Sequence, residues 1–205
     1  MPQPTSVSGL EKLGRVRLSQ SFFLRDFLYS EISQIYGIPN IPDDPDLAIE
    51  AGTHLCQELL EPLQEKFGRL ATRSGYRSCD VNRLGNENGH SCSNNEANYA
   101  GHIWDRRDSN GHMGATACVV VAAFVPYYER TGNWQSMAWW IHNHLPYSEL
   151  EFYPKLAAFN ITWHESPTRS IYSYIKPRRG WLTKSGMPNH EGDHSEFYLT
   201  IPFFD

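Results

Sequence analysis

The sequence has no run of about 18 apolar residues, so it offers no membrane-spanning helix. Its first residues, MPQPTSVSGLEKLG, lack the apolar core of a secretory signal, and we expect a cytoplasmic protein unless another export route operates. It also has no basic run: the formal net charge is -5 and the pI is about 6.0. That balance argues against a nucleic-acid-binding protein.

The four cysteines include no Cys-x-x-Cys pair, which argues against a structural zinc knuckle. With 205 residues, 40% of them hydrophobic, the chain can bury a core without disulfides. Cys56 lies on an apolar helical stripe and is predicted to be buried. Cys79 and Cys92 lie in polar sequence and could pair, bind a metal or do neither. No internal repeat is present, and we expect a loosely held arm over 1–17 followed by one domain over 18–205.

Helical periodicity dominates the first third of the chain. Apolar residues recur at spacings of three and four over 21–36 and again over 46–67. Gly37 and Gly68 are predicted to end these helices. Residues 83–98, RLGNENGHSCSNNEAN, are nearly all loop formers and predict a long polar loop, which in a compact domain is often functional.

Strand patterns dominate the rest of the chain. Residues 119–124 are apolar and typical of a buried strand, while SELEFY, AFNITWHE and SEFYLTIPFF each predict a further strand. Apolar and polar residues alternate in AFNITWHE, so Asn160, Thr162 and His164 should share its polar face. Helices followed by strands predict an α+β fold in which the N-terminal helices pack on a mainly antiparallel sheet.

An arginine follows a predicted strand end in the segment SGYR, residues 74–77. If its neighbours hold it still, its planar guanidinium can bind a carboxylate through two parallel hydrogen bonds. An ordinary turn with a surface arginine would have the same sequence. Arg77 is therefore a candidate carboxylate-binding residue.

Histidines supply candidate metal ligands. Catalytic zinc takes about three protein ligands from His, Asp, Glu or Cys and leaves one position open for water. His102, Asp105, Cys118 and His164 lie in extended or turn sequence around one predicted sheet and could meet at one point. Each of them could equally be a hydrogen-bonded strand residue.

Four segments follow one another in order between residues 18 and 82: LSQSFFLRDFLYS, GIPNIP, LCQELLEPLQEKFG and SGYRSCDVN. In this order and spacing they resemble the peptidase M15 family, the zinc D-Ala-D-Ala carboxypeptidases and L,D/D,D-endopeptidases that share their fold with hedgehog signalling domains. A patchier match continues to about His164. The resemblance implies a hedgehog/DD-peptidase-like fold in which Arg77 holds the peptide substrate near the metal, while Ser74 and Tyr76 shape its pocket.

The metal motif departs from this family. The family pattern is S-x-H-x-x-G-x-A-x-D, and GATAC keeps the glycine and the second alanine but has Cys118 where the metal-binding aspartate is expected. His112 is one position away from the family's histidine, and His102 matches only if the DSNG hairpin is an insertion. The last family ligand is a histidine after a tryptophan, which His164 matches.

Our first hypothesis is a zinc-dependent peptidase that cleaves a peptide or amide bond, for example in bacterial cell-wall peptidoglycan. One zinc ion would be bound by His102, Asp105 and His164, with Cys118 or His112 as the alternative third ligand. Arg77 would then bind a substrate carboxylate close to His164.

Zinc hydrolysis also needs a base that takes a proton from the metal-bound water. In the family this glutamate lies a few residues before the last histidine, where FNIT contains no acid. Glu165, Glu149 and Glu151 are the nearby candidates, and Glu165 is the predicted base.

Two other hypotheses stay open. One is a non-catalytic binding or structural protein on the same scaffold, which uses the cleft without activating water. The other is an iron oxygenase, because HIWD with a distant histidine imitates a His/Asp/His facial triad. The expected partner is a peptide or a peptidoglycan-like ligand, and the sequence leaves the oligomeric state open.

Overall fold

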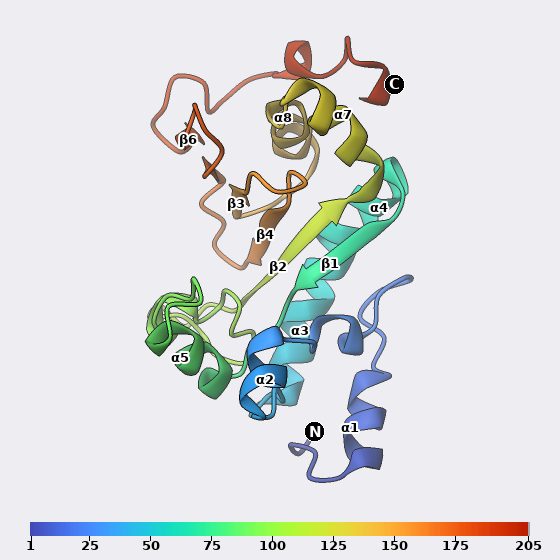
Figure 1. Cartoon of the computed structure of the whole chain (residues 1–205), viewed down its shortest axis with the longest axis vertical. Coiled ribbons are helices and arrows are strands. Elements are labelled where there is room, and N and C mark those ends of the chain that lie inside the picture. The colour runs from blue at the N-terminus through green and yellow to red at the C-terminus, as the bar shows by residue number, and fades with distance from the viewer. Residues whose placement is uncertain (205) are drawn as a thin grey trace.

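Within residues 1–204, which this computed structural model describes, a six-stranded, mostly antiparallel sheet forms the centre of the fold (Figure 1). The strand order is β1–β2–β4–β3–β5–β6, and the β3–β5 pair is parallel. The strands are β1 Leu70–Ser74, β2 Gly114–Val121, β3 Glu149–Phe152, β4 Phe159–His164, β5 Ser170–Ser173 and β6 Gly180–Thr183. The predicted α+β class with a mainly antiparallel sheet is confirmed.

Along the chain, helices precede the first strand and also separate β1 from β2 and β2 from β3. The α-helices are α1 Val7–Gly14, α2 Glu31–Tyr36, α3 Pro45–Leu55, α4 Glu61–Phe67, α5 Cys79–Glu87, α6 Asn95–Asn98, α7 Val125–Thr131 and α8 Gln135–His144. A π-helical turn, Cys56–Leu60, joins α3 to α4. Short 3₁₀ turns occupy Leu24–Phe27, Ala122–Phe124, Ser195–Phe197 and Pro202–Phe204.

The long helix predicted over 46–67 is confirmed. Asp44 caps its start by accepting a hydrogen bond from the Leu47 backbone N–H at 3.2 Å, and Pro45 occupies the first turn. Gly68, with φ of 78°, ends it, because a residue without a Cβ adopts positive φ without strain. Cys56 is fully buried on this helix, as predicted.

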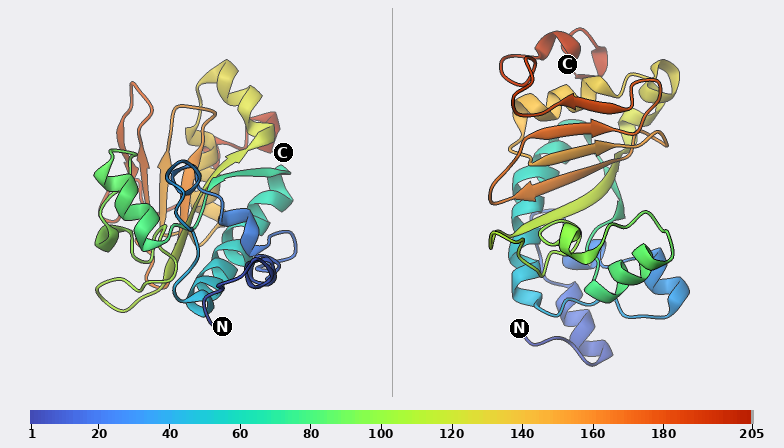
Figure 2. Two further views of the ribbon diagram at one scale, coloured as in Figure 1. Left: turned by 60° about the horizontal axis from the view of Figure 1, so that its bottom comes forward. Right: turned by 90° about the vertical axis from the view of Figure 1, so that its left-hand side faces the viewer.

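The sheet has an apolar face and a polar face. In β4, Phe159, Ile161 and Trp163 are buried in the core, as their alternation with polar residues predicts. Helix α3 packs against β2 and β4 on this face. Figure 2 (left) shows α3 and α4 in cyan on one side of the sheet and α5 in green on the other. The α5–α6 region and the loops beside it therefore lie over the polar face of the sheet.

The N-terminal segments differ from their predictions. Of the helix predicted over 21–36, only the last six residues form an α-helix, which Ser30 caps by accepting a hydrogen bond from the Ser33 N–H at 3.3 Å. The arm expected over 1–17 contains α1, whose Leu13 is fully buried in the core. Burial of that side chain attaches α1 to the domain.

Two further predictions were wrong. The polar loop predicted over 83–98 contains most of α5 and the short helix α6, both begun by side-chain caps at Ser78 and Asn94. The last predicted strand, SEFYLTIPFF, forms 3₁₀ turns, and Phe204 packs edge-on against Phe67 of α4. In the first case the predicted loop began at residue 83, so it left out the Ser78 cap and the first residues of α5, and five of the nine residues of this helix are polar.

No helix in the described part of the chain is long and apolar enough to cross a membrane.

Candidate functional site

A cleft of about 1220 Å³ opens over the polar face of the sheet. Loops and helix α6 form one wall, and the strands form its floor. The floor residues are Ser74, Thr116, Cys118, Glu149, Glu151, Asn160, Thr162 and His164. Such a large concave surface lined by polar groups is where a ligand is expected.

Four floor residues form a row across four strands. Ser74 pairs with Cys118, Cys118 with Asn160, and Asn160 with Glu151. Directly paired residues present their side chains on the same face of a sheet. The row therefore crosses the cleft floor from the β1 edge to β3.

Glu151 is held at one end of this row by three neutral donors. The Asn160 amide donates to Oε2 at 2.9 Å, the Tyr153 hydroxyl donates to Oε2 at 3.2 Å and the Tyr174 hydroxyl donates to Oε1 at 3.3 Å. Within residues 1–204, no Lys, Arg or His forms an ion pair with it. Glu151 is thus a fixed carboxylate without a cationic partner.

Arg77 lines the cleft near the other end of the row. Its position depends on Gly75, since a Cβ there would lie 2.7 Å from the Phe27 Cβ and 3.0 Å from the Phe27 Cα. The Arg77 backbone N–H donates to the His102 carbonyl at 2.8 Å, which fixes the turn. Ser78 then caps α5.

The Arg77 guanidinium has no carboxylate partner among the described residues. Its Nη1 donates to the Cys92 Sγ at 3.4 Å, a weak contact for a cation. Ser74, predicted to shape the same pocket, also lines the cleft. Tyr76 does not: it is 1% exposed and packs edge-on against Trp104 in the core.

His102 lines the cleft but is itself 6% exposed. Its Nδ1 lies 2.8 Å from the Gly75 carbonyl oxygen, which requires a proton on Nδ1 and leaves Nε2 as the acceptor. Burial, and then the nearby charge of Arg77, lower the pKa of His102 to about 3. This histidine is therefore a neutral imidazole at physiological pH.

Asp105 was predicted as a zinc ligand beside His102, and the structure does not bring the two together. Its Oδ2 accepts hydrogen bonds from the backbone N–H groups of Asp43 at 2.7 Å and Asp44 at 3.4 Å. Its side chain is 1% exposed and lies 3.5 Å from the Arg106 guanidinium. Asp105 joins the loop before α3 to the 102–106 turn, outside the cleft.

We expect the change Asp105→Ala to lower the free energy of unfolding by about 1–3 kcal/mol, because buried N–H groups lose their acceptor. Denaturant unfolding measures this loss. Asp80→Ala, at an exposed position on α5, is the control and should cost less than about 1 kcal/mol. An unchanged unfolding free energy in Asp105→Ala would contradict the structural role.

Glu165, the predicted base, does not line the cleft. Its Oε2 accepts a hydrogen bond from the Met113 N–H at 2.6 Å and lies 3.4 Å from Arg107 Nη1. These contacts attach the end of β4 to the turn before β2. Glu149 and Glu151, the other candidates, do line the cleft.

His164 lies in the cleft, but far from Cys118. It pairs with Gly114, whereas Cys118 pairs with Asn160, four residues earlier in β4. Four residues of a strand span about 13 Å. One metal ion cannot therefore contact both Cys118 and His164, and Asn160 occupies the position opposite the cysteine.

His164 instead lies beside Asp108 and His112. Its Nε2 is 3.4 Å from Asp108 Oδ2, which is also 3.5 Å from His112 Nδ1. Even so, no group of three or more His, Cys, Asp or Glu residues within 1–204 is arranged so that it could hold a metal ion. The predicted set His102, Asp105 and His164 does not fit zinc.

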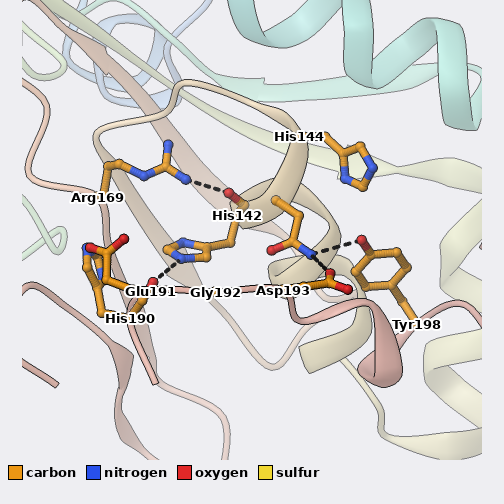
Figure 3. A pocket seen from close by; sticks show the side chains of 9 residues that line it. His142, His144, Arg169, His190, Glu191, Gly192, Asp193 and Tyr198 are labelled. Atoms are coloured by element: carbon orange, nitrogen blue, oxygen red, sulfur yellow. Dashed lines mark hydrogen bonds and ion pairs between the residues drawn. The ribbon is translucent and has the colours of Figure 1, made fainter. Parts of the chain in front are cut away.

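A second pocket, of about 560 Å³, lies between α8 and the C-terminal loop (Figure 3). His142 places Nδ1 2.6 Å from the Tyr147 hydroxyl and Nε2 2.9 Å from the His190 carbonyl oxygen, while Arg169 donates to the His142 carbonyl. Burial lowers the pKa of His142 to about 4. Both of its ring nitrogens have partners, so the residue connects the loop to α8.

No protein-family profile, curated protein or solved structure matches this chain. A function must therefore be inferred from the cleft itself. Sequence reasoning named Arg77, Ser74, His102, Glu149, Glu151 and His164, which the structure places around this cleft. It assigned no role to Asn160, Tyr153 or Tyr174, although the alternation of β4 did place Asn160 on the polar face.

Proposed function

We propose that the protein is a peptide-binding relative of the M15 peptidases, in which Arg77 holds a ligand carboxylate and zinc-dependent hydrolysis has been lost. The observation that carries this proposal is Arg77 itself: a guanidinium that lines a large cleft and has no carboxylate partner within residues 1–204. A guanidinium in a cleft is suited to bind a planar carboxylate through two hydrogen bonds.

The arrangement of elements supports a hedgehog/DD-peptidase-like scaffold. A long helix, Pro45–Phe67, precedes the edge strand β1, and the SGYR segment at the end of that strand contributes Ser74 and Arg77 to the cleft lining. The GATAC strand β2 and the His164 strand β4 then form the centre of an antiparallel sheet. These are the segments that resemble the family in the sequence.

The cleft supports binding better than zinc hydrolysis. Cys118, at the position of the family's aspartate, faces Asn160, which is a poor zinc ligand compared with histidine. The predicted base, Glu165, lies outside the cleft. The iron alternative needs His102 and Asp105 at one metal, and Asp105 is bound to the Asp43 and Asp44 backbone.

Trialanine and trialanine amide, titrated separately into the protein by calorimetry, test the proposal. We expect trialanine to bind about tenfold or more tightly than the amide, because a charge-assisted hydrogen bond is worth about 1.5–3 kcal/mol. Binding should be the same with EDTA. Equal affinity for the two peptides would contradict the carboxylate role, and zinc-dependent cleavage of trialanine would contradict the loss of hydrolysis.

A further inference from the structure

The charged groups that line the cleft are unbalanced. They comprise one arginine, Arg77, and four carboxylates: Glu96, Asp108, Glu149 and Glu151. Asp108 faces His112 and His164, but the three glutamates form no ion pair within residues 1–204. A carboxylate-bearing ligand that also carries a positive charge would complement this cleft best.

Glu151 is the best-formed site for that positive charge. Its carboxylate is oriented by Asn160, Tyr153 and Tyr174, all through neutral hydrogen bonds that leave its charge uncompensated. The rings of Tyr153 and Tyr174 stack on each other, with centroids 5.2 Å apart and an interplanar angle of 3°, and the Arg179 guanidinium lies 5.4 Å from the centroid of the Tyr174 ring. The Tyr174 ring thus already has a cation over it, and a ligand ammonium would be bound by the Glu151 carboxylate.

Glu149 adds negative potential beside Glu151, from two residues earlier on the same strand and face. Desolvation of its carboxylate, and then repulsion from Glu151, raise the pKa of Glu149. A positive charge on the ligand would relieve that repulsion.

The spacing of the row suits a short peptide. Ser74 and Glu151 are three strand-to-strand steps apart, which corresponds to about 14 Å, and Arg77 follows Ser74 at that edge. An extended chain advances about 3.3–3.6 Å per residue, so a tripeptide spans about 10–11 Å. Its two termini can therefore approach the two charged ends of the cleft.

We infer that the cleft selects short peptides with a free amino terminus as well as a free carboxylate: Arg77 binds the carboxylate, and Glu151, oriented by the Tyr153 and Tyr174 hydroxyls, binds the terminal ammonium. This inference rests on the proposed function, because it assumes that Arg77 defines the carboxylate end. Asn160 acts as a positioning residue that holds Glu151.

The test compares trialanine with N-acetyl-trialanine, which keeps the carboxylate and loses the ammonium. We expect the acetylated peptide to bind about tenfold or more weakly. Glu151→Gln should weaken trialanine binding by a similar factor but leave N-acetyl-trialanine binding unchanged. Glu129→Gln, at an exposed position on α7, is the matched control and should bind both peptides like the wild type.

Each outcome separates this inference from the proposed function. If N-acetyl-trialanine binds as tightly as trialanine while trialanine amide binds weakly, the ammonium site is wrong and the carboxylate role of Arg77 stands. If trialanine and its amide bind equally, or neither binds, the proposed function fails and this inference fails with it. Thermal melting of Glu151→Gln shows whether the variant is folded. The affinities of the wild type for trialanine and N-acetyl-trialanine test the inference without any variant.

Discussion

Arg77→Lys is expected to weaken trialanine binding about tenfold or more, because lysine keeps the charge but loses the planar fork. Arg77→Ala should weaken it further. The protein should stay folded in both cases, since the turn is held by the Arg77 backbone N–H and not by the guanidinium. Calorimetric titration with trialanine measures the change.

The matched control is Arg83→Lys on α5. Arg83 is exposed and forms ion pairs with Asp80 and Glu87 on its own helix. The Arg83→Lys variant should bind trialanine as tightly as the wild type does. If Arg77→Lys binds trialanine as tightly as this control does, a simple positive charge is sufficient and Arg77 does not bind the carboxylate through two hydrogen bonds.

The second large effect that we expect is a loss of folding stability at low pH. The pKa of His102 is about 3 in the folded protein, below the ordinary value near 6.5 of an exposed histidine. Below pH 6.5 the unfolded chain therefore binds a proton that the folded protein does not. Folding stability falls as the pH is lowered from about 6.5 toward 3, with a slope from this one residue of up to about 1.4 kcal/mol per pH unit.

Denaturant unfolding of wild type and His102→Gln between pH 7 and pH 4 measures this effect. The variant is expected to be less stable at pH 7, because it loses the contact with the Gly75 carbonyl. The wild type, however, should lose about 3 kcal/mol more than the variant between the two pH values. His142 titrates in both proteins and cancels from the comparison. If the free energies of unfolding of wild type and variant changed equally with pH, the folded protein would tolerate a proton on His102, which would contradict the prediction.

The elements that could be predicted are those whose pattern is local. The helix Pro45–Phe67 combines an apolar stripe with an aspartate cap and a terminal glycine, and β4 alternates without interruption. Helix α5 was missed because polar residues dominate it and its cap at Ser78 lies inside the SGYRS segment. Strands β5 and β6 were missed because they are only four residues long, within a segment rich in Pro, Gly and Arg.

The candidate site was only partly predictable, because it depends on register. The sequence placed Cys118 and His164 on neighbouring strands but could not show that Cys118 pairs with Asn160. Nor could it show that Asp105 turns toward the 43–44 backbone, since that contact joins residues about sixty positions apart. Arg77 was easier to predict, because the SGYR segment follows a predicted strand end, although the contacts that fix its turn come from Phe27 and the His102 carbonyl.

The most direct test of the carboxylate role is the NMR signal of the Arg77 Nε–Hε group, assigned by its absence from the spectrum of Arg77→Lys. A guanidinium that binds a carboxylate has its Nε–H held in a hydrogen bond, which changes its chemical shift and slows its exchange with water. We predict that trialanine shifts and sharpens the Arg77 signal and that trialanine amide leaves it unchanged. An Arg77 signal that does not move while trialanine shifts other residues of the protein would contradict the account.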